Sequence, residues 1–467
     1  MKRYSVQTFG CQMNVHDSRR IEEVLEAEGY QPADGPSDAD VIVLNTCSVR
    51  EKAEQKLRSM VGTYKGLKAL RPDLVIVVAG CVAQQEGERL LRRVPHLDVV
   101  IGPDNIAELP GLIESVRDGA PPLARTVFDV QSPGWLLAKP RTKQREVTSF
   151  VTVMKGCDER CTYCIVPYTR GPERYRPADE IIGELARMVE GGVREITLLG
   201  QTVNSWHSQG TGEGESEFPQ LLRRIAREVP ALLRLRYTSP HPRHLTDELI
   251  AAHADLPVLP RHVHMPVQSG SDRMLKRMLR RYTAADYVRR VKALQTRVPG
   301  LTFSTDMIVG FPGETDDDFE ATLRLVREVG FVSLFGFKYS PRPYTPALKL
   351  DDDVPEELKD ERLQRLFAVS EELQRAHLLS CVGTRVKVLI ESRDETRSDR
   401  FVGRSDRHEL VHVDVPAGLD PIGREVEVEI AEAYNHSLRG MMEGSVFTLI
   451  PGPVPKRGPI RLPVASA

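Results

Sequence analysis

The sequence predicts an α/β protein of three parts: an N-terminal parallel α/β sheet domain, a central partial (β/α)6 barrel and a C-terminal small β-barrel. Three observations lead to this prediction. In the first part, short apolar runs alternate with helical patterns, as in parallel sheets with helices on both faces. In the second part the alternation gives six repeats, too few for a closed eight-fold barrel. The last part has short β-branched runs separated by turn residues.

The domain boundaries are placed where the composition changes. A polar, proline-containing stretch, KPRTKQREVTS, separates the first two parts, and a long helical pattern precedes the third. The end of the chain is rich in proline, which is typical of disorder. The predicted parts are residues 1–135, 145–375 and 380–450, followed by a Pro-rich tail at 451–467.

In the first part, three cysteines lie at the ends of successive strand candidates. Cys11 follows the first strand, Cys47 ends the second and Cys81 follows the third, while Asp17 and Ser18 are candidates to cap the first helix. Because the carboxyl ends of strands form the ligand crevice of an open α/β sheet, the three thiols could share a metal or cluster site. A free cysteine is often simply buried, but three at equivalent places favour a shared site.

The strand candidates of the other two parts are short apolar runs. In the central part, helical patterns separate FVTVMKG, EITLLG, LRLRYTS, HVHMPV, FSTDMIVG and SLFGFKYS. A barrel built from them should carry its active site over the carboxyl ends of the strands. In the last part the candidates are TRVKVLIES, FVGRSD, LVHVDV, REVEVEIAEAY and SVFTLI.

The composition is that of an ordinary globular protein. Charged residues make up 28% and hydrophobic ones 40%. The formal net charge of −2 gives no strong overall attraction to nucleic acid or anionic lipid, so any basic surface must be local. The N-terminal segment has no apolar core of a signal peptide, and no apolar run reaches the roughly 18 residues of a membrane helix. We therefore expect a cytoplasmic protein with no membrane partner.

Three more cysteines, Cys157, Cys161 and Cys164, lie within eight residues directly after the first central strand candidate. A structural zinc site usually has four Cys or His ligands, and the nearest downstream histidine, His207, is far away in sequence. Iron–sulfur clusters are held by cysteine thiolates, usually four. Three thiolates would leave one iron open to a substrate or cofactor. The remaining cysteine, Cys381, belongs to no motif and is expected to be structural.

The spacing C-x3-C-x2-C, with Tyr163 before the third cysteine, resembles the signature of the radical S-adenosylmethionine (SAM) superfamily. The resemblance implies that Cys157, Cys161 and Cys164 hold a 4Fe–4S cluster whose open iron binds SAM. In that superfamily, one electron from the cluster cleaves SAM to a 5′-deoxyadenosyl radical, and the resemblance implies the same step here. SAM contacts are expected from Tyr163, Gly200, Gln201 and Asp306, although a glycine there can equally serve a turn and an inward carboxylate can equally be paired structurally.

Further motifs resemble the methylthiotransferase family within that superfamily, over residues 1 to about 450. They are TFGCQMN, NTCSVREKA, GCVAQQEGE, GCDERCTYCIVPYTRGPERYRP, LLGQTVNSW, MPVQSGSD, DMIVGFPGET and FKYSPRP. The central part would then be a radical SAM barrel, and the C-terminal barrel resembles a TRAM domain. Two residues depart from the family pattern: Tyr344, where we expect Gly, and Pro172. Neither departure touches a cysteine.

The resemblance implies a second, auxiliary 4Fe–4S cluster on Cys11, Cys47 and Cys81. It also implies an activity, the addition of a methylthio group to carbon 2 of N(6)-dimethylallyladenosine beside the anticodon of tRNA, with two SAM molecules used. The expected partners are that tRNA, a sulfur source and an electron donor such as flavodoxin or ferredoxin. The protein is expected to be a monomer.

The whole protein has little net charge, so any RNA contacts are expected from local groups of basic residues. One group is the basic run between Arg273 and Arg297, and a second is Arg170, Arg174 and Arg176. Two other functions stay open. The first is a related methylthiotransferase that acts on threonylcarbamoyladenosine or on a ribosomal protein. The second is a non-catalytic iron–sulfur or zinc protein that binds RNA.

Overall fold

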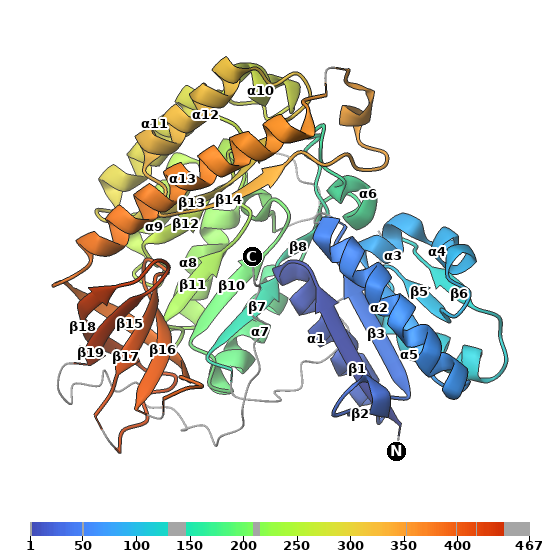
Figure 1. The fold of residues 1–467 in the computed structure, drawn as a ribbon. Coiled ribbons are helices and arrows are strands. Elements are labelled where there is room, and N and C mark those ends of the chain that lie inside the picture. The colour runs from blue at the N-terminus through green and yellow to red at the C-terminus, as the bar shows by residue number, and fades with distance from the viewer. Residues whose placement is uncertain are drawn as a thin grey trace.

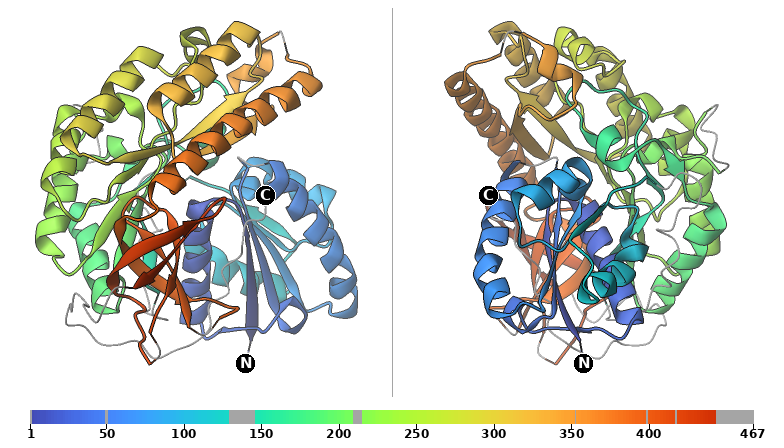
Figure 2. Two further views of the ribbon diagram at one scale, coloured as in Figure 1. Left: turned by 60° about the vertical axis from the view of Figure 1, so that its left-hand side comes forward. Right: turned by 90° about the vertical axis from the view of Figure 1, so that its right-hand side faces the viewer.

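The computed structural model describes residues 2–48, 51–128, 146–208, 215–351, 353–397, 399–416 and 418–442. Figure 1 shows an N-terminal domain, a central domain with helices on its outside, and a small C-terminal barrel beyond the long helix α13. The N-terminal domain and the barrel lie on the same side of the central domain (Figures 1 and 2). The predicted Pro-rich tail and the strand candidate SVFTLI lie outside the described residues.

The N-terminal domain is built on a parallel sheet, which in the described residues has the strand order β2-β1-β3-β4-β5-β6. Every residue of β3 and β4 is buried, because helices cover both faces of the sheet. The elements are β1 (Arg3–Phe9), α1 (Gln12–Ala27), β2 (Gln31–Pro32), β3 (Val41–Thr46), α2 (Glu51–Leu70), β4 (Val75–Gly80), α3 (Cys81–Glu86), α4 (Glu88–Arg93), β5 (Val99–Ile101), α5 (Leu109–Arg117) and β6 (Leu123–Arg125).

The first helix begins earlier than the sequence predicts. Its N-cap is Cys11, and Asn14 completes a capping box with it, so Asp17 and Ser18 are buried inside the helix rather than capping it. The reason is that an asparagine three residues after a cysteine can satisfy the same backbone groups as a conventional cap. As a result, Cys11 is held at the junction of strand and helix.

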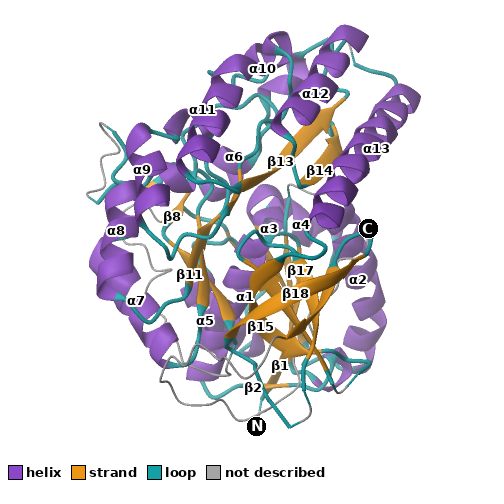
Figure 3. Cartoon of the chain, turned by 90° about the vertical axis from the view of Figure 1, so that its left-hand side faces the viewer, coloured by secondary structure: helices purple, strands orange, loops and turns teal. Residues whose placement is uncertain are grey.

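The central domain is a partial (β/α)6 barrel, as predicted. Its parallel strands form two ladders, β7-β10-β11 and β12-β13-β14, with helices outside (Figure 3). The strands are β7 (Thr148–Thr152), β8 (Met154–Lys155), β9 (Arg174–Tyr175), β10 (Glu195–Leu199), β11 (Arg234–Tyr237), β12 (His262–His264), β13 (Thr302–Val309) and β14 (Ser333–Lys338). The helices are α6 (Val166–Arg170), α7 (Ala178–Glu190), α8 (Phe218–Glu228), α9 (Asp247–Asp255), α10 (Asp272–Arg277), α11 (Ala284–Arg297), α12 (Asp316–Val329) and α13 (Glu356–Ser380).

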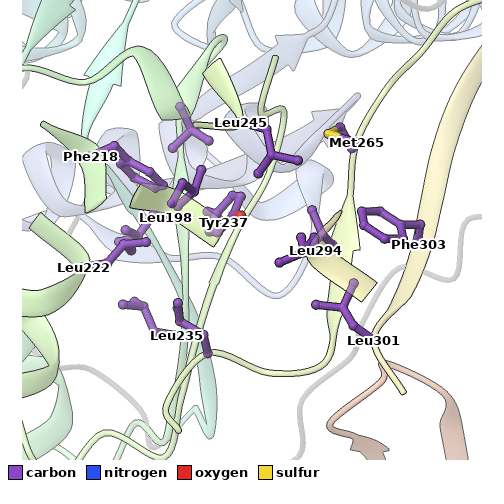
Figure 4. Close-up of a cluster of buried hydrophobic side chains, with 14 of the residues drawn as sticks. Leu198, Phe218, Leu222, Leu235, Tyr237, Leu245, Met265, Leu294, Leu301 and Phe303 are labelled. Atoms are coloured by element: carbon purple, nitrogen blue, oxygen red, sulfur yellow. The ribbon is translucent and has the colours of Figure 1, made fainter. Parts of the chain in front are cut away.

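The main core of the central domain lies between the strands and their outer helices. Alternate residues of each strand point outward, where they meet the apolar faces of the helices. Figure 4 shows this packing with side chains from β10, α8, β11, α11 and β13. The labelled residues are Leu198, Phe218, Leu222, Leu235, Tyr237, Leu245, Met265, Leu294, Leu301 and Phe303. The opposite residues of the same strands are left to line the inside of the barrel.

The C-terminal domain is a closed barrel with the strand order β15-β16-β17-β19-β18. Its strands are β15 (Arg385–Arg393), β16 (Arg400–Ser405), β17 (Leu410–Asp414), β18 (Glu425–Ala433) and β19 (Leu438–Met442). The sequence predicts the first four of these, but it misses β19. Arg234 of β11 attaches the barrel to the central domain, since its guanidinium donates to the carbonyl oxygens of Arg404, Ser405 and Lys387.

Buried ion pairs join the N-terminal and central domains. Arg20 of α1 pairs with Glu184 of α7 at 2.6 Å, and Lys155 pairs with Asp104 at 3.4 Å. His16 and Thr152 are 3.2 Å apart across the same interface. Such pairs fix the relative position of two domains. In the part of the chain that the structure describes, no helix is long and apolar enough to span a membrane.

Candidate functional site

The first cysteine site forms where three strands end in register. Phe9 of β1 pairs with Thr46 of β3, which pairs in turn with Gly80 of β4. Cys11, Cys47 and Cys81 come one or two residues after these aligned positions, at the carboxyl edge of the sheet. The Cys11 and Cys47 thiols are hydrogen-bonded, and the Cys81 thiol interacts electrostatically with that of Cys11. The structure therefore brings together the three cysteines that the strand ends predict.

Two glycines allow the close approach of these strand ends. Gly10 has φ 147° and Gly80 has φ 91°, in the region that favours glycine. A Cβ at Gly10 would collide with Cys47, and a Cβ at Gly80 would lie 2.8 Å from the carbonyl oxygen of Thr46. Each glycine directly precedes a cysteine. A glycine before Cys11 and before Cys81 thus lets the strand ends come close enough to bring the cysteines together.

A buried arginine from the central domain completes the first site. The Arg170 Nε donates to the Cys81 Sγ at 3.2 Å, and its Nη2 pairs with the Asp17 Oδ2 at 2.6 Å. Both side chains of the pair are at most 3% exposed. The hydrogen bond from Cys47 and the Arg170 cation together lower the pKa of Cys11 to about 6, whereas burial raises the pKa of Cys81. The central domain thus supplies a charge to thiols of the N-terminal domain.

The second cysteine site lies in the loop after β8, at the carboxyl end of the first central strands. The Cys157 Sγ lies 3.1 Å from the Thr202 Oγ1, and the Arg280 Nη1 donates to the Cys161 Sγ at 3.5 Å. Burial raises the pKa of Cys157 to about 12 and also raises the pKa of Cys164. The neighbouring Cys161 and Cys157 thiols also raise the pKa of Cys164, as expected for three thiols that lie near one another.

Both donor sets fit an iron–sulfur cluster with an open iron. Each consists of three thiols, and thiolates are the usual ligands of such clusters. Among the described residues, neither of the two His-containing groups with metal-binding geometry includes any of these six cysteines. Structural zinc usually has four Cys or His ligands, so it is the poorer match at both places. Cys381 lies elsewhere, in the core of the C-terminal barrel.

Two of the predicted SAM-contact residues have a structural role in the second site. The Gln201 Oε1 accepts a hydrogen bond from the Gly156 backbone N–H at 2.6 Å, directly before Cys157. Gly200 directly follows β10, and a Cβ there would lie 2.6 Å from the Met154 Cγ. Gly200 is therefore required by packing, and Gln201 holds the cysteine loop.

The other two predicted SAM-contact residues lie near the same loop and inside the barrel. The Tyr163 ring packs edge-on against Phe311 at a centroid distance of 6.5 Å. Asp306 lies on the face of β13 opposite the core residues Phe303 and Met307, and its Oδ1 is 3.6 Å from the His264 Nε2. Asp306 therefore faces the barrel interior with a histidine beside it.

A group that the sequence analysis did not single out lies beside the second site. Glu159, within the cysteine loop, is 3.4 Å from the Arg243 guanidinium and 3.7 Å from the His244 Nε2. Buried His241 lies in the same group, and burial lowers its pKa well below the usual value. The signal that could have found it is the HPRH motif after β11, which follows a strand end as the cysteines do.

Several of the basic residues proposed for RNA binding are buried or paired with acidic side chains of the protein. Arg170, Arg174 and Arg176 pair with Asp17, Asp104 and Glu184 respectively. In the basic run, Arg280 is buried at the second site, and Arg273, Arg289 and Lys292 pair with Asp318, Asp286 and Glu328. These pairs neutralise part of the positive charge, so less basic surface remains than the sequence suggests.

Three family models match the three domains. They are the uncharacterized protein family UPF0004 at residues 3–102, the radical SAM superfamily at residues 151–326 and the TRAM domain at residues 379–442. Solved structures of TsrM, a radical SAM methyltransferase from Kitasatospora setae, share the fold. One, with cobalamin and a [4Fe-4S] cluster bound, has a TM-score of 0.53 at 15% identity and covers 82% of this chain and 79% of that chain.

A second TsrM structure, with tryptophan substrate and a SAM analog bound, gives a TM-score of 0.55 at 15% identity, over 84% of this chain and 79% of that chain. The sequence likeness is greater to a relative from Sorangium cellulosum (strain So ce56), named tRNA-2-methylthio-N(6)-dimethylallyladenosine synthase. The two are 61% identical over 462 residues, which cover 94% of this chain and 93% of the relative. With all three domains in place, the chain belongs to the family of tRNA-2-methylthio-N(6)-dimethylallyladenosine synthases, which are radical SAM methylthiotransferases.

Proposed function

We propose that this chain adds a methylthio group to carbon 2 of N(6)-dimethylallyladenosine beside the anticodon of tRNA. The observation that carries the proposal is the presence of two separate three-cysteine sites in a chain 61% identical to a synthase of that name. A SAM-cleaving enzyme with a single cluster would need only one such site. The second three-cysteine site would hold another cluster, which could supply the sulfur.

The residues present fit two 4Fe–4S clusters and SAM. Cys157, Cys161 and Cys164 would hold the cluster that binds SAM, and the three strand-end cysteines would hold the auxiliary cluster. When bound, the first cluster supplies the electron that cleaves SAM to a radical, and the auxiliary cluster supplies sulfur. Gln201 keeps the cysteine loop in place, and Tyr163, Gly200 and Asp306 are the further residues that we propose to contact SAM.

The chemistry of the target explains why the chain needs cofactors. Carbon 2 of the adenine ring carries an unactivated hydrogen, whose acidity is far below that of any group a side-chain base can deprotonate. The protein therefore contributes binding, orientation and electrostatics. Here those contributions are the rigid strand ends, the cysteine loop and the arginines at Cys81 and Cys161.

The partners follow from this reaction. The tRNA would contact the C-terminal barrel together with the edge between the two cysteine sites, since small β-barrels commonly bind nucleic acid on one face. The reaction also needs an electron donor such as flavodoxin or ferredoxin, and a sulfur source that renews the auxiliary site. We infer a monomer, because one chain carries both cysteine sites.

The test is mass spectrometry of tRNA nucleosides from a strain that lacks this gene. We expect the 2-methylthio form of dimethylallyladenosine to disappear and the unthiolated form to accumulate. Complementation with the intact gene should reverse both changes, and complementation with the Cys157→Ala variant should not. If the nucleosides are unchanged, the substrate assignment is wrong, and threonylcarbamoyladenosine and ribosomal peptides should be analysed next.

A further inference from the structure

Two exposed aromatic rings and an arginine meet where the N-terminal and central domains join. Tyr168 of α6 is 45% exposed, and Tyr344, in the loop after β14, is 50% exposed. Their ring centroids are 5.9 Å apart, with the planes inclined by 36°. Arg89 of α4 donates from its Nη2 to the Tyr344 hydroxyl at 2.6 Å, and its Cζ lies 5.8 Å from the Tyr344 ring centroid. We call Tyr168, Tyr344 and Arg89 the aromatic platform.

The aromatic platform lies between the two cysteine sites. Tyr168 is on the short helix α6, which begins two residues after Cys164. Arg170, at the end of the same helix, reaches the Cys81 thiol of the first site. Figure 1 shows α6 beside α3, at the junction of the two domains. An exposed ring on this helix is therefore close to both places where chemistry would occur.

The loop that carries Tyr344 is attached on both sides of this junction. The backbone N–H of Ala347 donates to the carbonyl oxygen of Thr162, within the second cysteine loop, at 2.9 Å. Arg342 reaches across to Glu54 of α2 in the N-terminal domain, at 3.4 Å. These contacts hold the Tyr344 ring in a fixed place relative to both cysteine sites.

The backbone of Tyr344 is strained. Its φ is 68°, in the left-handed region where a bulky residue is unfavourable and glycine is normal. Glycine is also the residue that the family resemblance leads us to expect at this position. Strained residues persist where the surrounding structure fixes them, and they cluster at ligand sites. The contacts with Tyr168 and Arg89 fix this strained residue, and half of the Tyr344 side chain stays exposed, where a ligand could pack against it.

We propose that the aromatic platform stacks a nucleobase next to the target adenosine when the anticodon loop of the tRNA is bound. The proposal rests on the proposed function. Proteins that recognise single-stranded RNA loops stack unpaired bases on aromatic rings and on arginine. A target base turned into the site between the cysteines loses its own stacking neighbour, and the neighbour is left with an uncovered face. The platform covers that face, and Arg89 adds a positive charge beside the rings.

The test uses a synthetic RNA hairpin that carries dimethylallyladenosine, with 2-aminopurine as the next base, since stacking quenches its fluorescence. Tyr344→Gly should raise the Kd about tenfold and abolish the quenching, because stacking on one aromatic ring contributes about five- to 150-fold in affinity. Glycine accepts a φ of 68°, so this variant should fold at least as stably as the wild type. Tyr344→Phe should keep the affinity within about twofold, since it keeps the ring and loses only the hydroxyl contact with Arg89.

Leu70→Ala is the matched control. Leu70 is 83% exposed and lies at the far end of α2, about 30 Å along the helix from the first cysteine site. This variant should bind the hairpin like the wild type. If Tyr344→Gly also binds and quenches like the wild type, the platform does not stack a base. If Tyr344→Phe and Tyr344→Gly weaken hairpin binding equally, the stacking proposal is also wrong. The role of Tyr344 would then be its hydrogen bond with Arg89. If the wild type itself does not bind the hairpin, the proposed function fails together with this inference.

Discussion

The two cysteine sites are built in different ways. The first collects Cys11, Cys47 and Cys81 from three strand ends, so it exists only when β1, β3 and β4 pair in register. The second takes all its thiols from one loop of eight residues. The first site is therefore a property of the tertiary fold, and the second is largely a property of local sequence.

The two sites nevertheless use the same local devices. A glycine with positive φ precedes a cysteine in each, at Gly80 and at Gly156, whose φ values are 91° and 84°. A buried arginine also donates to one thiol in each, Arg170 at the first site and Arg280 at the second. The sites thus differ in the segments that supply the cysteines and share a glycine and an arginine beside them. Variants at these residues can test each site independently of the other.

The largest effects are expected from the glycines. Gly156→Ala would place a Cβ against the Pro172 carbonyl oxygen, and Gly80→Ala would place one against Asn45. Each variant should therefore lose one cluster, about four of the roughly eight irons expected for two 4Fe–4S clusters. Iron analysis and electron paramagnetic resonance with and without SAM check this. The remaining signal should respond to SAM in Gly80→Ala and not in Gly156→Ala.

A glycine on a helix surface provides the control for these two variants. Gly66 lies within α2, and a Cβ there would have no heavy atom within 4 Å. Gly66→Ala should keep the full iron content and gain up to about 1 kcal/mol in stability, because alanine favours helix. Full iron content in Gly80→Ala would contradict the idea that the first site depends on close strand ends.

The next largest effects are expected from the arginines. Hydrogen bonds and positive charge at the sulfur ligands raise the reduction potential of an iron–sulfur cluster. Arg170→Met should therefore lower the potential of the auxiliary cluster, and Arg280→Met that of the SAM-binding cluster. Potentiometric titration followed by electron paramagnetic resonance checks whether each variant shifts only its own cluster. A shift of both potentials in either variant would mean that the arginines act through the fold.

Arg170→Met should change the stability of the folded protein as well as the reduction potential of the auxiliary cluster, and the two effects must be measured separately. Arg170→Met leaves buried Asp17 without its partner, which costs about 3–5 kcal/mol. The double variant Arg170→Met/Asp17→Asn removes that uncompensated charge. We expect it to recover most of the lost stability while the lower potential remains, which assigns the potential to the arginine itself.

A smaller effect, on stability and tRNA binding, is expected from Arg234, which attaches the C-terminal barrel to the central domain. Arg234 donates to three carbonyl oxygens of the barrel and pairs with Glu425 at 2.8 Å. Arg234→Met should lower the free energy of unfolding by about 3 kcal/mol and weaken tRNA binding, with both iron sites intact. Urea denaturation, RNA binding and iron analysis check these outcomes. Arg223→Met is the control, because its pair with Asp255 is exposed and contributes less than about 1 kcal/mol.

The sequence predicts the framework of both sites better than their surroundings. Strand-end cysteines and the six βα repeats follow from local patterns, and the structure has both. The partners of Arg170 and Arg280 do not follow, because they come from distant segments that only the folded chain brings together. The sequence does not predict β19 because LRGMM contains no β-branched residue. This segment becomes a strand through its pairing with β17 and β18.

The two large domains should also respond to pH in opposite directions. In the N-terminal domain, burial and the nearby Glu26 raise the pKa of Glu22 to about 7. In the central domain, burial lowers the pKa of His253 to about 4. Glu22 holds its proton in the folded state, so its contribution is favourable at low pH and is lost as the pH rises through 7. His253 is held neutral, so its contribution is favourable above about 6.5 and is lost as the pH falls toward 4.

The smallest expected effect comes from removing the charge of Glu22. At pH 8 the wild type must ionise this partly buried carboxyl, whereas Glu22→Gln has nothing to ionise. A shift of one pKa unit corresponds to about 1.4 kcal/mol, and solvent screening reduces the effect at a partly exposed group to about 1 kcal/mol. Glu22→Gln should thus slow hydrogen exchange of the α1 amides at pH 8, with little change at pH 5, where the wild-type carboxyl already carries its proton. Equal slowing at both pH values would mean that the glutamine acts through packing. No change at either pH would show that Glu22 ionises in the folded domain without cost.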